Sequence, residues 1–410
     1  MRQSLEKLKK NTKKLLNLSP KDKEEIILRL AEALFKDKEA ILKANERDLA
    51  SFTKSEALKD RLLLNEKRLN ALCASLRQIA LLEDPVGRVL EGWINYAGLK
   101  IEKVAVPLGV VCVIYEARPA ISAELIALLL KSSNGGILKG GSEAKNTNFA
   151  IFDCVKAILK DYDLDTCFLM MSERAELDEL LKMNDLIDIL VPRGSSAMIA
   201  EIESKSKIPL IKHDKGLCHI FVDESVNLRQ AVAIIINAKC QRVSVCNALE
   251  SLLVHKNIAK ELFSLLKDEF EKNKLELYAD EESSKLLKDT KLTLHKATSE
   301  DYSTEWLDYK LSIKQVSSIS EAIEHINAYG SAHSDAILSN DAANIALFQR
   351  QVNSACVFVN ASTRFCDGGE FGFGAEVGIS TSKLHARGPM GLRELCTYKY
   401  LISGEGQIRG

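Results

Sequence analysis

Net charge is almost absent from this sequence: 56 Lys and Arg residues nearly balance 57 Asp and Glu residues, which leaves a formal charge of −1 at pH 7. A chain without net positive charge lacks the electrostatic attraction that binds nucleic acid or an anionic membrane. No apolar run approaches the roughly 20 residues of a membrane span. The first residues, MRQSLEKLKKNTKKLL, lack the apolar core of a signal peptide. We therefore expect a cytoplasmic protein that binds neither nucleic acid nor membrane.

Cysteine is present, but not in the spacing that metal sites or disulfide frameworks use. Ten cysteines are spread from Cys73 to Cys396, with no C-x-x-C pair and no cluster with histidine. We therefore expect neither a metal site nor a disulfide framework. In a reducing compartment most of these residues would be buried thiols, which pack as small hydrophobic side chains.

The two commonest nucleotide-binding signatures are also missing, because no G-x-G-x-x-G follows a strand and no P-loop is present. Two other turns have the composition to hold an anion: ILKGGSEAKN (137–146) and ILVPRGSSAMIAEI (189–202). Glycine lets the backbone approach a ligand, and a helix N-terminus favours negative charge. Each alone is compatible with an ordinary βα turn, whereas the two together favour a phosphate-bearing ligand. The candidate residues are Lys139, Gly140, Gly141, Ser142, Arg193, Gly194 and Ser195.

The apolar pattern predicts an α/β protein. Residues 1–82 read as helices, with Ser19 as an N-cap and Pro20 in the first turn. From Gly109 to about residue 385, short apolar runs alternate with helical segments, and KIPLIKH (207–213) is one of the runs expected to be a strand. This alternation predicts parallel sheets covered on both faces. A chain of 410 residues should form two or three domains.

A β-hairpin is predicted over residues 87–105, with its turn near residues 95–98. Two-stranded ribbons are marginal by themselves. The hairpin should therefore pair with something else, and another subunit is one candidate.

Cys246 differs from the other cysteines in its position. It lies between a helix that ends near Arg242 and a strand that begins near Leu249, and connections of this kind commonly present reactive groups. No histidine is spaced as an obvious base, and His255 at the far end of the strand reads as structural. Backbone dipoles and nearby cations favour a thiolate in some turns. From position alone, Cys246 is either a nucleophile or one more packed thiol.

A glycine-rich stretch, GGEFGFGAEVGIST (368–381), is the third feature. Its five glycines indicate either a flexible loop or a backbone that approaches a ligand closely. Arg364, just before it, follows the strand CVFVN, and α/β sheets bind ligands at the carboxyl ends of strands. A guanidinium in that place suits an anionic substrate.

Longer blocks of the sequence carry a resemblance to a known family. They are VPLGVVCVIYEARP, ILKGGSEA, IPLIKHDKGLCH, QRVSVCNALESLLVH, VNASTRFCDGGEFGFGAEVGIST and KLHARGPMGLRELCTYKY. From about residue 20 to the C-terminus, the chain resembles the γ-glutamyl phosphate reductase (glutamate-5-semialdehyde dehydrogenase) family of the aldehyde dehydrogenase superfamily.

The resemblance implies an aldehyde dehydrogenase-like α/β fold. Residues 1–86 and 106–212 would form a Rossmann-type nucleotide-binding domain, and residues 213–385 an α/β catalytic domain. Residues 87–105 and 386–410 would form a small β oligomerisation arm, with a return to the nucleotide-binding domain. The arm implies a homo-oligomer, and glutamate 5-kinase is a candidate partner.

The resemblance also implies a reaction: NADPH-dependent reduction of L-glutamate 5-phosphate to L-glutamate 5-semialdehyde and phosphate, in proline biosynthesis. Cys246 occupies the position of the family's nucleophile, which would attack the acyl phosphate and leave a thioester. Lys139–Ser142 and Arg193–Ser195 match the NADP-binding turns, with Lys139 near the adenosine ribose. The candidate substrate-binding residues are Asn247, Arg364 and Glu370.

Several positions bear on the choice of reaction. Hydrolytic aldehyde dehydrogenases resemble one another in a Glu that activates water, and Lys212 stands at that position here. Without a placed water base, a thioester survives long enough to react with hydride or phosphate. Ala120 replaces a family Asn, Ser142 replaces a Lys beside the NADP 2′-phosphate, and Val243-Ser244 replaces Pro-Gly. Two alternatives stay open: another phosphorylating or hydrolytic aldehyde dehydrogenase acting on an acidic semialdehyde, or an inactive scaffold.

Overall fold

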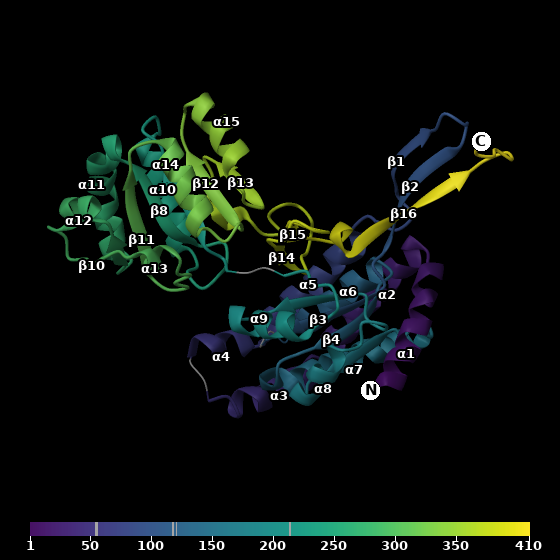
Figure 1. Cartoon of the computed structure of the whole chain (residues 1–410). Coiled ribbons are helices and arrows are strands. Elements are labelled where there is room, and N and C mark those ends of the chain that lie inside the picture. Colours follow the sequence, from purple (N-terminus) through teal and green to yellow (C-terminus); the bar gives the residue numbers. More distant parts are fainter. Residues whose placement is uncertain (54–55, 117–118, 120, 213–214) are drawn as a thin grey trace. The chain divides into compact units, whose positions relative to one another are not determined.

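The computed structural model (Figure 1) describes residues 1–53, 56–116, 119, 121–212 and 215–410. Ala120, the position of the replaced family Asn, lies outside the described residues. The chain divides into two compact units, which are described separately. Unit 1 comprises Met1–Lys212, Gly372–Gly378 and Met390–Gly410, and unit 2 comprises His213–Phe371 and Ile379–Pro389.

Unit 1 begins with the predicted helical region. It contains α1 (Arg2–Asn11), the 3₁₀ helix η1 (Thr12–Asn17), α2 (Pro20–Lys36), α3 (Lys38–Ala50), α4 (Glu56–Leu62) and α5 (Glu66–Leu81). The predicted start of α2 is confirmed: the Ser19 side chain accepts from the Asp22 N–H, and the Asp22 carboxylate accepts from the Ser19 N–H. This capping box satisfies two donors that a helix start otherwise leaves unpaired.

The sheet of unit 1 has four parallel strands in the order β5-β4-β3-β6. They are β3 (Val110–Tyr115), β4 (Gly135–Lys139), β5 (Phe168–Met171) and β6 (Ile189–Arg193). The helices α6 (Ile121–Lys131), α7 (Lys145–Asp161), α8 (Arg174–Leu180) and α9 (Ser196–Lys205) follow the strands in turn. The chain thus builds outwards from β3 to β5 and then returns to place β6 on the other side of β3.

The strand predicted over residues 207–213 is wrong for its described part. Leu210 forms only an isolated bridge with Leu190. Pro209 has no N–H to donate to a ladder, so the pairing does not extend along the chain. His213 lies outside the described residues.

The predicted hairpin is confirmed as β1 (Val89–Ile94) and β2 (Lys100–Pro107), joined by a turn in which Gly98 has a φ of +82°. Its partner is a strand of the same chain, β16 (Cys396–Ser403), which pairs antiparallel with β2 along its whole length. The three strands form a separate sheet in the order β1-β2-β16. We call this sheet the arm.

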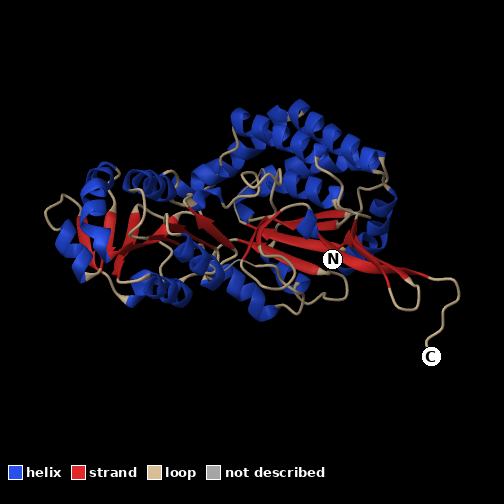
Figure 2. Ribbon diagram, turned by 90° about the horizontal axis from the view of Figure 1, so that it is seen from above, coloured by secondary structure: helices blue, strands red, loops and turns tan. Residues whose placement is uncertain are grey.

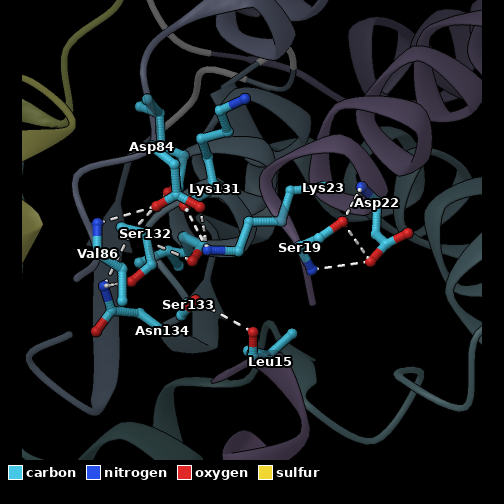
Figure 3. A network of polar contacts seen from close by, with 12 residues as sticks. Leu15, Ser19, Asp22, Lys23, Asp84, Val86, Lys131, Ser132, Ser133 and Asn134 are labelled. Carbon is cyan, nitrogen blue, oxygen red and sulfur yellow. Dashed lines mark hydrogen bonds and ion pairs between the residues drawn. The ribbon is translucent and has the colours of Figure 1, made fainter. Parts of the chain in front are cut away.

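A buried polar network holds the base of the arm (Figure 3). Lys23 Nζ lies 2.6 Å from Asp84 Oδ2, and neither side chain is more than 8% exposed. Asp84 Oδ1 accepts from the Val86 N–H, just before β1. Asn134 accepts from the Gly109 N–H and donates to the Leu395 carbonyl, just before β16. Both connections to the arm are therefore tied to the core of unit 1.

Unit 2 contains a seven-stranded parallel sheet in the order β10-β9-β11-β8-β7-β12-β13. The strands are β7 (Cys218–Val222), β8 (Leu249–His255), β9 (Glu276–Ala279), β10 (Thr293–Lys296), β11 (Lys310–Val316), β12 (Ser334–Leu338) and β13 (Cys356–Val359). Helices cover both faces, as predicted (Figure 2). They are α10 (Leu228–Cys240), α11 (Lys256–Lys272), α12 (Glu281–Leu287), α13 (Ser299–Tyr302), α14 (Ile319–Tyr329) and α15 (Ala342–Gln351).

The remaining elements are short. Two 3₁₀ helices, η3 (Thr363–Phe365) and η4 (Arg393–Leu395), precede the glycine-rich stretch and β16, and β14 (Gly378–Ser380) pairs with β15 (Gly388–Met390). Within the described part of the chain, no helix combines the length and apolar character needed to cross a bilayer.

Candidate active site

Cys246 lies in the turn between α10 and β8, as the sequence predicted, and is partly buried. The two ends of this turn are joined by a buried ion pair, in which Lys239 Nζ lies 2.7 Å from Glu250 Oε2 and neither side chain is exposed. Burial raises the pKa of Glu250 and lowers that of Lys239. The Leu307 N–H also donates to Glu250 at 3.1 Å. The base of the Cys246 turn is therefore fixed by its own side chains.

Asn247 and Arg364, both predicted as substrate-binding residues, are in direct contact. The Arg364 guanidinium donates to the Asn247 side-chain oxygen and to Gln241 Oε1, the latter at 2.8 Å. Asn247 Nδ2 donates to the Cys366 carbonyl at 2.9 Å, and Thr363 Oγ1 donates to the Asn247 carbonyl at 2.8 Å. These bonds hold the residue after Cys246 in one orientation.

Arg364 and Glu370 line the same cavity, whose volume is about 330 Å³. Its other lining residues are Asn237, Gln241, Phe365 and Asp367. Burial and the nearby Arg242 lower the pKa of Arg364, whereas Cys246 and Asp367 act in the opposite direction. The guanidinium keeps its charge at neutral pH, because an arginine pKa begins so high. Arg364 therefore brings a cation to a cavity that also contains the carboxylates of Asp367 and Glu370.

The position of Arg364 differs from the expectation. A residue that follows a strand should lie at the carboxyl edge of the sheet, but the chain turns back after β13. Asn360 has a φ of +51°, and its side chain bonds both the N–H and the carbonyl of Ser339. By Cys366 the chain has returned to the start of β13, where the Cys366 and Cys356 sulfurs are 3.5 Å apart. The site therefore lies at the amino ends of β8 and β13.

The two predicted nucleotide-binding turns of unit 1 lie at the carboxyl edge of its sheet. Lys139 ends β4 and Arg193 ends β6, and these strands flank β3. This is the point where the chain changes direction across the sheet, and open α/β sheets bind ligands there. Lys139 Nζ donates to the Gly140 carbonyl at 3.0 Å. Arg193 Nη2 lies 3.9 Å from Glu376 of the glycine-rich stretch.

The small residues of these turns fit a phosphate-bearing cofactor. A methyl group on Gly140 would overlap the Asn148 side-chain amide, so glycine lets this turn pack closely against α7. Ser195 is the N-cap of α9, accepting from the Met198 N–H at 3.4 Å, with Gly194 just before it. Gly141 and the exposed Ser142 lead from β4 into η2 (Ser142–Ala144) and then α7. The start of α9 can therefore attract an anion at this edge. The first N–H groups of α7 are already used, because those of Asn146 and Thr147 donate to the Asp48 carboxylate at 3.1 and 2.8 Å.

Comparison with known proteins shows that the whole chain is similar to the members of one enzyme family. The model of the aldehyde dehydrogenase family matches residues 2–285. The γ-glutamyl phosphate reductase of Campylobacter jejuni is 60% identical over 409 residues, covering 100% of both chains. The chain belongs to the γ-glutamyl phosphate reductase family. The crystal structure of the Thermotoga maritima γ-glutamyl phosphate reductase matches with a TM-score of 0.96 and 39% identity, over 100% of this chain and 99% of that one.

Dehydrogenases with much lower sequence identity share the fold. Glyceraldehyde-3-phosphate dehydrogenase GapN of Methanocaldococcus jannaschii, in a structure complexed with NADP, matches with a TM-score of 0.69 and 16% identity over 98% of this chain and 94% of that one. The aldehyde dehydrogenase-like α/β fold and the family resemblance are thus confirmed. The roles of individual residues and the functional domain boundaries stay predictions.

Three contacts of the Cys246 turn were not foreseen from the sequence: those made by Gly216, Cys218 and Thr363. All three lie within family blocks, but their spacing in the chain gives no sign of contact. For Gly216 and Cys218, the order of strands expected from the sequence did contain a signal. A βαβ unit places the starts of consecutive parallel strands side by side, so residues before β7 should approach residues before β8.

Proposed function

We propose that this member of the γ-glutamyl phosphate reductase family reduces L-glutamate 5-phosphate with NADPH to L-glutamate 5-semialdehyde and phosphate, in proline biosynthesis. One observation carries the proposal: the residue after Cys246, Asn247, is bonded to Arg364, which lines a cavity together with Glu370. A nucleophile beside a cation suits an acyl phosphate that also bears a carboxylate.

The chemistry follows from the side chains present. The Cys246 thiolate forms a bond to the acyl carbon, and the carbon–oxygen bond breaks with its electron pair leaving on phosphate, which gives a thioester. Backbone N–H groups of the turn stabilise the oxyanion that forms. NADPH, when bound, supplies the hydride that turns the thioester into aldehyde and free thiol. Arg364 and Asn247 orient the substrate.

The identity of residue 212 in the sequence supports a thioester that is not hydrolysed. The Lys212 ammonium is paired with Glu203 at 2.6 Å, so the position that holds a water-activating Glu in hydrolytic relatives holds a cation here. A protonated lysine does not remove a proton from water. The thioester is therefore left for reduction, and phosphate is the acceptor in the reverse direction.

For the cofactor, the proposal assigns Lys139 to the adenosine ribose and Arg193–Ser195 to the diphosphate. Ser142 lacks the charge of the family Lys, but it does not repel a 2′-phosphate, so this turn is compatible with NADPH. Ser142→Glu should raise the KM for NADPH by roughly tenfold and leave that for NADH nearly unchanged, because like charges repel at close range. Equal changes for the two cofactors would argue against this assignment.

For assembly, the proposal assigns homo-oligomer formation to the arm. The arm exposes the apolar side chains of Trp93, Ile94, Tyr96 and Ile402, and exposed large apolar side chains are typical of interaction sites. Sedimentation of the whole protein tests this, with Ile94→Lys/Ile402→Lys expected to lower the oligomeric mass. Association with glutamate 5-kinase and a cytoplasmic location belong to the same proposal. Co-purification and cell fractionation test them.

Turnover in the reverse direction is the decisive experiment. Glutamate 5-semialdehyde, NADP⁺ and phosphate should together produce reduced nicotinamide, with no product when phosphate is left out. Product without phosphate would favour a hydrolytic aldehyde dehydrogenase acting on an acidic semialdehyde. A folded protein that gives no product under either condition would favour the inactive scaffold.

A further inference from the structure

The turn that carries Cys246 packs against a short segment before and at the start of β7, residues 215–218. Gly216 lies so close that a methyl group added to it would overlap the Cα and the carbonyl oxygen of Cys246. The overlapped atoms are the Cys246 backbone and its Cβ, not the movable end of a long side chain. A side chain at Gly216 would therefore displace the Cys246 turn itself.

Cys218, the first residue of β7, makes a directional contact with the same turn. Its Sγ donates to the Cys246 carbonyl at 3.2 Å, and His333 Nδ1 lies 3.8 Å from the same sulfur. Cys218 is fully buried, and burial followed by the charge of Asp335 raises the pKa of its thiol well above the usual value. The thiol therefore keeps its proton at neutral pH and serves as a donor.

The far side of this segment is also held. The Gly216 N–H donates to Glu305 at 2.9 Å, and the Leu217 N–H donates to Ser331 Oγ at 3.0 Å. Beyond it, β7 is paired with β8, with Cys218 opposite Leu249. The segment is fixed from both directions and can impose its position on the Cys246 turn.

We propose that Cys218 is a positioning residue for Cys246. Its thiol fixes the peptide that joins Cys246 to Asn247, and Gly216 leaves the space in which that peptide lies. Together with the Thr363 bond to the next carbonyl, this sets two successive peptide planes around the reacting sulfur. The inference rests on the proposed function, because it takes Cys246 as the nucleophile.

The test compares Cys218→Ala, Cys218→Ser and the control Cys73→Ala, which removes a buried thiol from α5 in unit 1. The measurements are kcat and KM in the phosphate-dependent reverse reaction, and the rate at which iodoacetamide alkylates Cys246, read by peptide mass spectrometry. Cys218→Ala should lower kcat roughly 3- to 10-fold, the effect of one hydrogen bond, with KM unchanged and alkylation slowed. Cys218→Ser should recover both, because a hydroxyl also donates. Cys73→Ala should match wild type.

Gly216→Ala provides a steric test of the proposal that does not depend on the thiol. It should reduce turnover more than Cys218→Ala does, with circular dichroism confirming that the protein is folded. Wild-type turnover in Gly216→Ala, wild-type turnover in Cys218→Ala, or a loss that Cys218→Ser fails to reverse would each overturn the proposal. Failure of the proposed function looks different, because the wild type itself would then show no phosphate-dependent turnover. A nucleophile other than Cys246 would show as turnover that persists in Cys246→Ser.

Discussion

The two parallel sheets place their candidate residues at opposite edges. In unit 1, Lys139 and Arg193 are the last residues of their strands, so that site lies at the carboxyl edge. In unit 2, Cys246 precedes β8 and its neighbours Cys218 and Cys356 are the first residues of their strands, so that site lies at the amino edge. The same architecture therefore serves two different tasks.

The difference follows from the helices. At the carboxyl edge of a parallel sheet, helices begin, and their free N–H groups attract phosphate. At the amino edge, helices end, and α10 points its carbonyl end toward the Cys246 turn. That end disfavours a thiolate, so charge at Cys246 must be supported by side chains and turn N–H groups. Arg364 can stabilise such a charge. Its guanidinium bonds the next residue, Asn247, and Cys246 acts to raise the pKa of Arg364.

The largest expected effect comes from removing the reactive group at the amino edge. Cys246→Ala should lower kcat on the order of 10⁴-fold, because loss of a covalent nucleophile leaves only binding and oxyanion stabilisation. NADPH binding, measured by fluorescence titration, should stay unchanged, since the proposed cofactor-binding turns lie in the other sheet. Cys246→Ser with full activity would refute the assignment of the nucleophile.

Among the described residues, each unit has a buried lysine–carboxylate pair, and these two pairs allow a matched test. Lys239→Met or Lys23→Met leaves a buried carboxylate without its partner, which should cost about 3–5 kcal/mol of unfolding free energy. Lys239→Met should in addition lower kcat, because it frees one end of the Cys246 turn. Lys23→Met should not lower kcat, but should loosen the arm.

Urea unfolding measures both variants. Trp306 lies in unit 2 and Trp93 in the arm, and they are the chain's two tryptophans, so Trp93→Phe or Trp306→Phe isolates the fluorescence of one unit. A Lys239→Met/Glu250→Leu double variant should recover most of the stability, because no unpaired charge remains. Equal losses of kcat in the two lysine variants would contradict the expectation that only the Lys239–Glu250 pair supports the Cys246 turn.

Local patterns predicted much of this molecule. The capping residues at Ser19, the turn at residues 95–98 and the loop position of Cys246 depend on neighbouring residues, and all three are confirmed. The amino-edge site was not predictable in this way. It depends on the reversal at Asn360 and on the approach of Gly216 to Cys246, and both join segments far apart in the sequence.

A smaller effect is expected at the carboxyl edge. Lys139→Ala removes a cation from the end of β4 and should raise the KM for NADPH about 10- to 100-fold, the range of one charged hydrogen bond. Initial-rate kinetics measure the change. Alkylation of Cys246 in the absence of cofactor should keep its wild-type rate. A slower alkylation would show that the two sites are not independent, contrary to the comparison.

The smallest expected effect is a loss of stability at low pH. The part that histidines cause should fall on unit 2, because all seven histidines lie between residues 213 and 385, within unit 2. His325 packs against Tyr302, Tyr329 and His219, and burial, then His219 and Lys314, lower its pKa to about 3, against the opposing effect of Glu321.

A lowered histidine pKa means that the unfolded chain takes up a proton near pH 6.5 and the folded chain does not. The stability this provides is complete above pH 6.5 and is lost as pH falls from there toward 3. Between pH 7.5 and 5.5, unit 2 should lose about 1.4 kcal/mol through His325. His325→Phe, which keeps an aromatic ring, should reduce this loss in urea unfolding followed by Trp306. The same pH dependence in wild type and variant would assign the acid response to other groups.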